Sequence, residues 1–360
     1  MGTMKTRAIC LVLPLLLSSV LGMPAQTNTP PQYQPRPASS SVPFTTVVVE
    51  TPETKERNGI KDRAVALLKA KDYDQLDKLA AQYRSSKERY ADGFWKVFFV
   101  YDGLVPSVEV SDAEWGTRLS DLRNWILAKP DSITSRVALA NVMAAYAWKA
   151  RGSDWASKVT DEGWRLFEQR LNEAVKILDE AESLKEKCPF YWAVKMRTGL
   201  GLRYDRRQYD AIFSQATRFE PQYEAYYCRR AMYLLPRWYG EEGEWESDLT
   251  KSADRIGGEE GDIIYTQIVW AMNETHFYGN IFNDCKLSWS RVNRGFEIIE
   301  KRFPDSLAAK SEHAHLAALA GDARTSLRCF DQIAGKADLT VWVTQKRFER
   351  YATWAYTYGR

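Results

Sequence analysis

The sequence predicts an all-α protein built as an irregular α-solenoid of helix hairpins. Three observations predict it. Apolar residues recur at helical spacing through most of the chain after residue 57. No succession of β-branched runs bounded by turn residues is present, which excludes an all-β or βαβ architecture. Several prolines between helices are followed, ten residues later, by a small residue, and this regularity indicates a repeat.

Residues 1–25 have the order of a secretory signal peptide. An apolar run follows Lys5 and Arg7, and small residues come after it at Gly22 and Ala25. The run is shorter than the roughly 20 residues that a membrane-spanning helix needs. We therefore expect residues 1–25 to be cleaved and the mature chain to be exported, to the periplasm or outside the cell, without a stable membrane span.

The charge balance argues against nucleic acid as a partner. The chain of 360 residues is 45% hydrophobic and 27% charged, with a formal charge of +3. Loss of residues 1–25 removes Lys5 and Arg7 and no acid, which leaves 48 basic against 47 acidic residues, a charge of +1. A nearly neutral chain without a dense basic tract gives no field that would attract a polyanion.

Residues 26–57 differ in composition from everything that follows. Six prolines lie there among Ser, Thr and Gln. Such a segment buries too little apolar surface to offset the entropy of ordering it, so it is predicted to be a flexible linker. Residues 42–49 have β-propensity, but a lone strand without a partner is not a fold. The folded helical domain is then expected at 58–360.

The helices of this domain are placed by their apolar stripes and their caps. Ser111 and Glu114 form the Ser-x-x-Glu order of a capping box, which predicts a helix beginning there. Residues 91–105 are aromatic and are compatible with either a helix or a buried extended chain. The other predicted helices span 61–69, 73–84, 161–185, 244–256, 262–275, 288–303, 307–320, 323–334 and 339–356.

The repeat is defined by four prolines, each followed ten residues later by a small residue. The pairs are Pro130 with Ala140, Pro189 with Gly199, Pro221 with Ala231, and Pro304 with Ala314. A small residue lets the two helices of a hairpin cross closely, and the proline ends one unit before the next begins. The separation of Pro189 and Pro221 is close to one tetratricopeptide period, which is about 34 residues. The longer spacings elsewhere predict extra or irregular helices.

The repeat frame gives the first candidate site, a groove on the concave face. In a solenoid of this kind the first helix of each unit lines that face, and its mixed Met, polar and charged side chains suit an adaptable peptide-binding surface. The alternative is that the chain's own extra helices fill the groove. The candidate groove residues are Asn141, Met196, Arg203, Met232, Ser311 and His315.

The second candidate site is an aromatic turn after Pro236. Its aromatic side chains with nearby carboxylates could stack on, and hydrogen-bond to, a sugar or a peptide. The alternative is that the two Trp side chains fill a junction between helical segments while the glutamates cap the next helix. The turn residues are Arg237, Trp238, Tyr239, Glu241 and Trp245.

The cysteines and histidines predict no metal site or cofactor. The spacings are too wide for a CxxC motif, and His313 and His315 are two residues apart, so on a helix they point to different faces. An even number of cysteines in an oxidising compartment allows one or two disulfides, and buried free thiols are the alternative. The cysteines after the signal peptide are Cys188, Cys228, Cys285 and Cys329.

Three segments stand in an order that resembles one bacterial family. They are Tyr146–Gly152, with the sequence YAWKARG, Glu162–Phe167, with EGWRLF, and Tyr233–Gly240, with YLLPRWYG. The family is the domain of unknown function 4034, found in exported or envelope proteins with tetratricopeptide-like helices. The resemblance covers roughly residues 61–351 and implies the helical architecture and a bacterial origin. The family has no assigned activity, so the resemblance implies no catalytic residues.

These observations favour a binding function. We expect an exported helical-repeat module or scaffold for protein or peptide partners. No Gly-rich phosphate loop, serine nucleophile motif or metal motif is present in the sequence. The alternative is a hydrolase or lyase that acts on envelope glycan with paired carboxylates.

Overall fold

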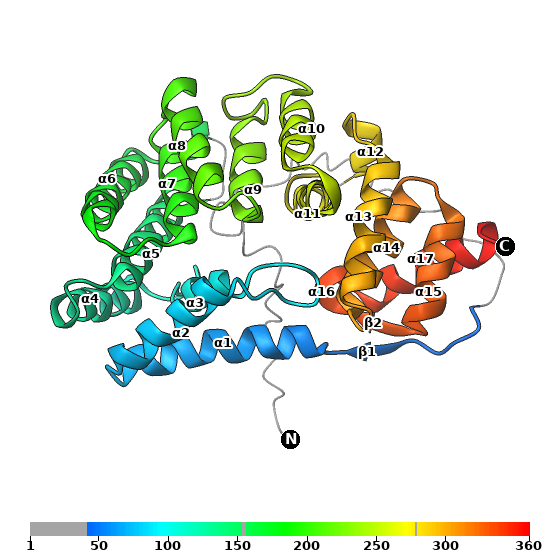
Figure 1. The fold of residues 1–360 in the computed structure, drawn as a ribbon, viewed down its shortest axis with the longest axis horizontal. Coiled ribbons are helices and arrows are strands. Elements are labelled where there is room, and N and C mark those ends of the chain that lie inside the picture. The colour runs from blue at the N-terminus through cyan, green and yellow to red at the C-terminus, as the bar shows by residue number, and fades with distance from the viewer. Residues whose placement is uncertain (1–41, 153–155, 278) are drawn as a thin grey trace.

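The computed structural model describes residues 42–152, 156–277 and 279–360. These residues form α-helices joined by short turns, with two three-residue strands, and the predicted all-α class is confirmed. Figure 1 shows the helices following one another around a ring, with α1 along one side and α8 to α10 opposite it.

The first half of the ring holds α1 to α9, preceded by β1 at Val47–Val49. These helices are α1 (Pro52–Lys69), α2 (Tyr73–Ser86), α3 (Lys96–Gly103), α4 (Asp112–Ala128), α5 (Ile133–Arg151), α6 (Asp161–Ser183), α7 (Pro189–Gly201), α8 (Arg206–Phe219) and α9 (Glu224–Tyr233). The second half consists of α10 (Glu244–Ile256), α11 (Gly258–His276), α12 (Ile281–Asp284), α13 (Trp289–Arg302), α14 (Leu307–Leu319), α15 (Ala323–Ile333), β2 (Lys336–Asp338), α16 (Leu339–Trp342) and α17 (Gln345–Tyr358).

The helices pair into hairpins whose two members differ in burial. The outer helices, which we define as α6, α8, α10, α13 and α15, bury one stripe each and expose the rest. The inner helices, defined as α5, α7, α9, α11 and α14, are buried on nearly every side. This contrast follows from the sequence: a one-sided apolar stripe suits a surface helix, and an apolar sequence all round suits an enclosed one.

The predicted capping box and the small residues of the repeat frame lie at close contacts in the structure. Ser111 and Glu114 form the predicted capping box at the start of α4. Ala140 and Ala314 are fully buried on inner helices, and the Ser326 hydroxyl donates a hydrogen bond to the Ala314 carbonyl at 3.0 Å, which fixes the α14–α15 crossing. Gly199 has no room for a side chain, since a Cβ there would lie 2.7 Å from the Tyr204 ring. The close crossings that the repeat frame requires are therefore present.

The N-terminal boundary is a correction. The helix α1 begins at Pro52, with Thr51 as its N-cap, ahead of the predicted boundary at 58. The segment that includes β1 also has a partner, because β1 pairs in parallel with β2. Phe44 packs its ring against Phe348 and Tyr356 of α17, with centroids 6.0 and 5.8 Å apart. Residues 42–57 thus join the two ends of the ring. The remainder of the predicted linker and the predicted signal peptide lie outside the described residues.

The last predicted helix, 339–356, is also divided in two. Val343 adopts a left-handed backbone with φ of 63°, and the chain resumes as α17 after Thr344, whose hydroxyl caps the new helix. The break turns α17 back against α15. Among the helices of the described residues, none combines the length and apolarity that crossing a bilayer requires.

Candidate functional site

The inner helices carry a set of polar side chains that the fold buries. We call this set the inner polar layer; each member is at most 4% exposed except Arg229 and Asn273, at 6%. Its members are Asn141 of α5, Arg197 of α7, Glu224 and Arg229 of α9, Gln267 and Asn273 of α11, and Ser311, Glu312 and His315 of α14. Charged side chains are rarely buried without partners, so this layer is the most unusual feature of the interior.

One part of the layer is basic. The Arg197 Nη1 donates to Asn141 Oδ1 at 3.5 Å. Burial lowers the pKa of Arg197 well below its usual value, the neighbouring Arg229 lowers it further, and Asp102 opposes the shift. Burial also lowers the pKa of Arg229. Within the part of the chain that the structure describes, Arg229 Nη1 has no hydrogen-bond acceptor. Two guanidinium groups therefore share a region enclosed by helices.

The other part is acidic. Arg347 of α17 donates from Nη2 to His315 Nε2 at 2.9 Å, so that nitrogen is an acceptor and the ring carries its proton on Nδ1. The Nδ1 lies 3.5 Å from Glu312 Oε1. Burial raises the pKa of Glu312 to about 8, although Arg347 opposes the shift. Glu274 of α11 lies beside the layer, and we call Glu274 and Glu312 the acidic pair. Burial raises the pKa of Glu274 well above its usual value, and the charge of Glu312 adds to this.

The two acids cannot both ionise without strong repulsion. Two nearby carboxylates in a low-dielectric site share a proton, which raises one pKa strongly. The His315 ring is neutral, because burial and the charge of Arg347 lower its pKa well below the usual value. The acidic part of the layer therefore holds a proton at neutral pH, because burial raises the pKa of Glu312 to about 8.

The loop between α2 and α3 brings the first hairpin against the inner helices. The Arg57 guanidinium of α1 pairs with Asp92, and Gln267 of α11 donates to the Asp92 carbonyl at 3.5 Å. Gly93 has a φ of +86°, and a Cβ there would lie 2.8 Å from Gln267 Nε2. Only glycine satisfies both the positive φ and this close approach. The loop thereby covers part of the inner helices.

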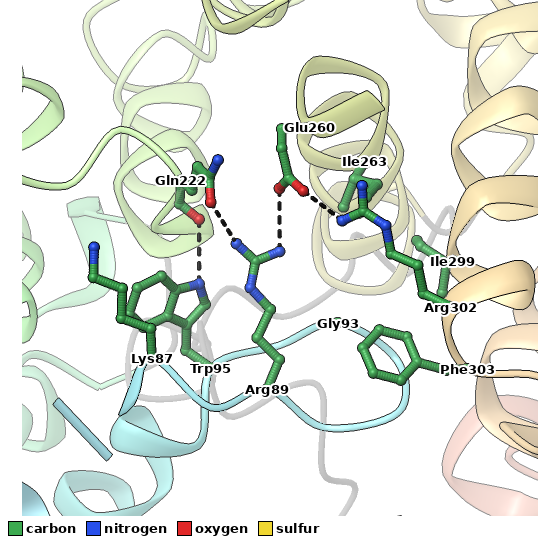
Figure 2. A pocket seen from close by; sticks show the side chains of 10 residues that line it. All are labelled: Lys87, Arg89, Gly93, Trp95, Gln222, Glu260, Ile263, Ile299, Arg302 and Phe303. Carbon is green, nitrogen blue, oxygen red and sulfur yellow. Dashed lines mark hydrogen bonds and ion pairs between the residues drawn. The ribbon is translucent and has the colours of Figure 1, made fainter. Parts of the chain in front are cut away.

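Beside this loop is a cleft of about 240 Å³, where the loop meets residues of α11 and α13 (Figure 2). Figure 2 shows Arg89 reaching across it, with Nη1 3.3 Å from Glu260 Oε2 and Nη2 3.2 Å from Gln222 Oε1. Arg302 of α13 also pairs with Glu260. The Trp95 indole donates to the Gln222 carbonyl at 3.2 Å. We call these contacts the closing joint. Arg302 also pairs with Glu259, so two acids balance the two arginines, and the joint is a contact between segments rather than a charged receptor.

The prediction of an open groove is wrong, because five of the six residues that are predicted to line it are buried. Five of its residues lie on inner helices as the repeat frame predicts, but each is at most 4% exposed, so they do not line an open surface. These are Asn141, Met196, Met232, Ser311 and His315. The physical reason is that the loop at 87–95 and helix α17 pack against the inner helices, which the repeat frame does not predict. Arg203 lies elsewhere: it is exposed in the α7–α8 turn with φ of +60°, and its guanidinium lies 5.8 Å from the Trp164 ring.

The aromatic turn forms a junction. Trp245 is 2% exposed and packs beside Phe277, while half-buried Trp238 lies against the Trp148 ring at 5.8 Å. Tyr239 donates to the Leu200 carbonyl at 3.2 Å. The turn is therefore not an open aromatic platform.

The charged residues of the turn have structural contacts as well. Exposed Arg237 contacts His276 Nδ1, at the end of α11. Glu241 is exposed, and its backbone N–H donates to Glu244 Oε2 at 2.9 Å, at the N-terminus of α10. Glu244 in turn pairs with Arg206 of α8 at 2.6 Å. The Glu244 carboxylate thus stabilises both the start of α10 and a contact between hairpins.

All four cysteines of the described residues are free thiols. Cys188 and Cys228 are fully or nearly fully buried, and burial raises the pKa of both thiols. Of the two possibilities that the sequence leaves open, the structure contains buried thiols.

The charged members of the inner polar layer are what the sequence predictions missed. A signal for them exists: Glu312 is the only acidic residue in the run 307–319, and Arg229 with Arg230 interrupts an otherwise aromatic and apolar segment. A helix that is otherwise apolar on every side is predicted to be enclosed, so a charged residue in such a helix is predicted to be buried as well. The repeat frame selected small and Met positions instead.

The fold defines a class, a helical-repeat protein whose hairpins close into a ring around a buried polar layer. Within the chain, residues 63–198 match the family model described as Domain of unknown function (DUF4034). The match runs from α1 to α7 and confirms the resemblance over that stretch, which includes the first two of the three segments quoted above. A search of curated proteins finds no match.

Proposed function

We propose that this protein is an exported helical-repeat binding module that holds an extended peptide in the inner polar layer. A carboxylate of the peptide contacts Arg229, and a basic or amide group contacts the acidic pair of Glu274 and Glu312. The export part of the proposal rests on the charged, apolar and small-residue order within residues 1–25.

The observation that carries the proposal is the buried guanidinium of Arg229. Its Nη1 has no acceptor among the described residues, and the neighbouring Arg197 adds like charge. Burying an unpaired charge costs several kcal/mol, whereas a fold gains by replacing it with an apolar side chain. A ligand carboxylate would supply the missing counter-ion and would make a charge-assisted hydrogen bond of the strong kind.

Other unpartnered polar atoms of the layer favour a peptide, rather than a small anion, as the ligand. Glu224 Oε2, Asn273 Oδ1 and Ser311 Oγ are buried without partners in the described part of the chain. They are spread over α9, α11 and α14, as donors and acceptors for an extended backbone would be. Because the layer is closed, peptide entry requires the closing joint to open; its Arg89–Glu260 and Arg302–Glu260 ion pairs are partly buried, with side chains 15–33% exposed.

The test is a binding selection with matched variants. A peptide library with free carboxyl termini is selected on the purified full-length chain, on Arg229→Met and on Arg165→Met, which changes an exposed arginine of α6. We expect the wild-type chain and the α6 variant to enrich the same acidic peptides. Arg229→Met is expected to lose at least tenfold in affinity while folding at least as stably, because it removes a buried charge.

An equal affinity of Arg229→Met and wild type for the selected peptides contradicts the proposal. So does a selection that enriches no sequence at all, or one in which the α6 variant loses binding alone. A pull-down from an envelope fraction with the same three proteins identifies the natural partner, which should be retained by wild type and lost by Arg229→Met.

A glycan-acting hydrolase or lyase is the second candidate, and the raised pKa of Glu312 is the observation that favours it. A carboxylic acid with a pKa of about 8 is protonated at neutral pH and can act as a general acid. The aromatic turn no longer supports this reading. Release of soluble fragments from purified envelope glycan, abolished in Glu312→Gln, would establish it; no release by wild type would exclude it.

A further inference from the structure

A cluster of metal-ligand side chains lies apart from the inner polar layer, where α13, α14 and α15 meet. Glu300, His313 and Cys329 each direct one ligand atom into the cluster, and these atoms all lie within 4.8 Å of one another. His313 and Cys329 are fully buried, while the Glu300 side chain is 11% exposed and leaves a path to the surface. Each residue comes from a different helix, so no spacing motif in the sequence predicts the cluster.

The hydrogen bonds around His313 determine which nitrogen carries its proton. The Asn293 amide donates from Nδ2 to Glu297 Oε1 at 3.0 Å, which fixes the amide orientation. Its Oδ1 therefore faces His313 Nε2, 2.8 Å away. An amide oxygen only accepts, so Nε2 carries a proton and donates it. A neutral ring then has its lone pair on Nδ1.

That lone pair points at a carboxylate. His313 Nδ1 and Glu300 Oε1 are 2.6 Å apart, and both are acceptors when the ring is neutral. A cation has to lie between them, either a second proton on the ring or a metal ion. The thiol of Cys329 beside them favours a metal, because a proton makes no use of a third ligand.

We propose that Glu300, His313 and Cys329 bind a zinc ion or a similar divalent transition metal. This set combines imidazole, thiolate and carboxylate, which zinc prefers. Asn293 acts as a positioning residue, since metal-bound histidines donate their other N–H to a carbonyl or carboxylate oxygen. Zinc bonds of about 2.0–2.3 Å place tetrahedral ligands roughly 3.3–3.8 Å apart, so shifts of about 1 Å bring the three atoms into place.

The charges and protons of the three ligands balance when a divalent metal ion binds. In the metal-bound state His313 is neutral and coordinates through Nδ1, and the Cys329 thiol releases its proton to solvent. The thiolate and the Glu300 carboxylate then neutralise the divalent charge. Arg328 lies near the carboxylate, with Nη1 3.9 Å from Glu300 Oε2, and stays on the more exposed side of the cluster.

The experiment uses the purified full-length chain, freed of metal with a chelator and then given one equivalent of zinc or cobalt. We expect one metal ion per chain after gel filtration, and a thiolate-to-cobalt charge-transfer band. Cys329→Ala should lose the band and at least about 100-fold in zinc affinity, and Asn293→Ala about 10- to 100-fold. The matched control is Cys228→Ala, a buried cysteine on α9, which should keep both.

X-ray absorption of the zinc-loaded wild-type chain provides a readout that depends on no variant. It should show one sulfur at about 2.3 Å and nitrogen or oxygen at about 2.0–2.1 Å. Absence of stoichiometric metal, a zinc shell without sulfur, or an unchanged cobalt band in Cys329→Ala would each overturn the proposal. In that case the second proton is the cation, and His313 and Glu300 form a buried ion pair.

Discussion

The acidic pair in the inner polar layer makes the stability of the fold depend on pH in a direction opposite to that of most acids. Burial raises the pKa of Glu312 to about 8 from the ordinary value of 4.5. The folded state therefore binds this proton more tightly than the unfolded state. The stability that the proton confers is fully present below about pH 4.5 and is lost as the pH rises through 8.

The size of the effect follows from the two pKa values. A difference of one in pKa corresponds to about 1.4 kcal/mol, so the rise from 4.5 to about 8 gives roughly 5 kcal/mol across that pH window. Glu312→Gln replaces the acid with a neutral side chain of similar shape. We expect the variant to match wild type within about 1 kcal/mol at pH 5 and to exceed it by about 3–5 kcal/mol at pH 9.

The assay is urea unfolding followed by tryptophan fluorescence at pH 5, 7 and 9. Comparison with wild type at each pH cancels the contributions of titrating groups that do not interact with Glu312, so the difference reports on Glu312 together with its neighbour Glu274. Glu109→Gln, which changes an exposed acid before α4, is the matched control and should follow wild type throughout. If Glu312→Gln and wild type lose the same free energy of unfolding between pH 5 and 9, Glu312 does not hold a proton in the folded state and the reasoning fails.

Two further predictions concern packing. Gly295→Ala should destabilise the fold by about 3 kcal/mol in urea unfolding, since its Cβ would lie 2.0 Å from Thr266 Oγ1. The control is Gly116→Ala. A Cβ at Gly116 would have no atom within 4 Å, so this variant should be neutral or stabilising by up to about 1 kcal/mol. A loss of equal size in both would contradict the described packing of α11 against α13. Phe44→Ala should speed hydrogen exchange in β1 and β2 at least tenfold while the inner helices stay protected; unchanged exchange in the two strands would show that Phe44 does not hold the ring closed.

The local signals in the sequence predicted the helices well. The capping box at Ser111, the long stripe of α6 and the Gly257–Gly258 break all act over a few residues, and the structure confirms them. The short strand pair was not predictable in this way. Its second strand, Lys336–Asp338, carries no β-branched residue, and the pairing joins segments from opposite ends of the described chain.

The interior was harder to predict than the helices, for a physical reason. The repeat frame identifies which helix of a hairpin lies inside, and it correctly assigns Asn141 and His315 to inner helices. Whether such a face is open depends on what crosses it, and here the loop around Asp92 contacts α11. The effect of the Glu312 charge on the pKa of Glu274 likewise depends on two helices meeting, which the pattern of a single helix does not reveal.

Binding of a peptide in the inner polar layer can be established by locating a bound peptide in the protein. A peptide from the selection, carrying a photo-reactive residue beside its acidic group, is cross-linked to the full-length chain and the attached residues are identified by mass spectrometry. We expect attachment within α7, α9 and α11, around Arg197 and Arg229, and none to Arg229→Met at the same concentration. Attachment confined to the outer helices α6 and α8, or to the turn at 236–245, would contradict it.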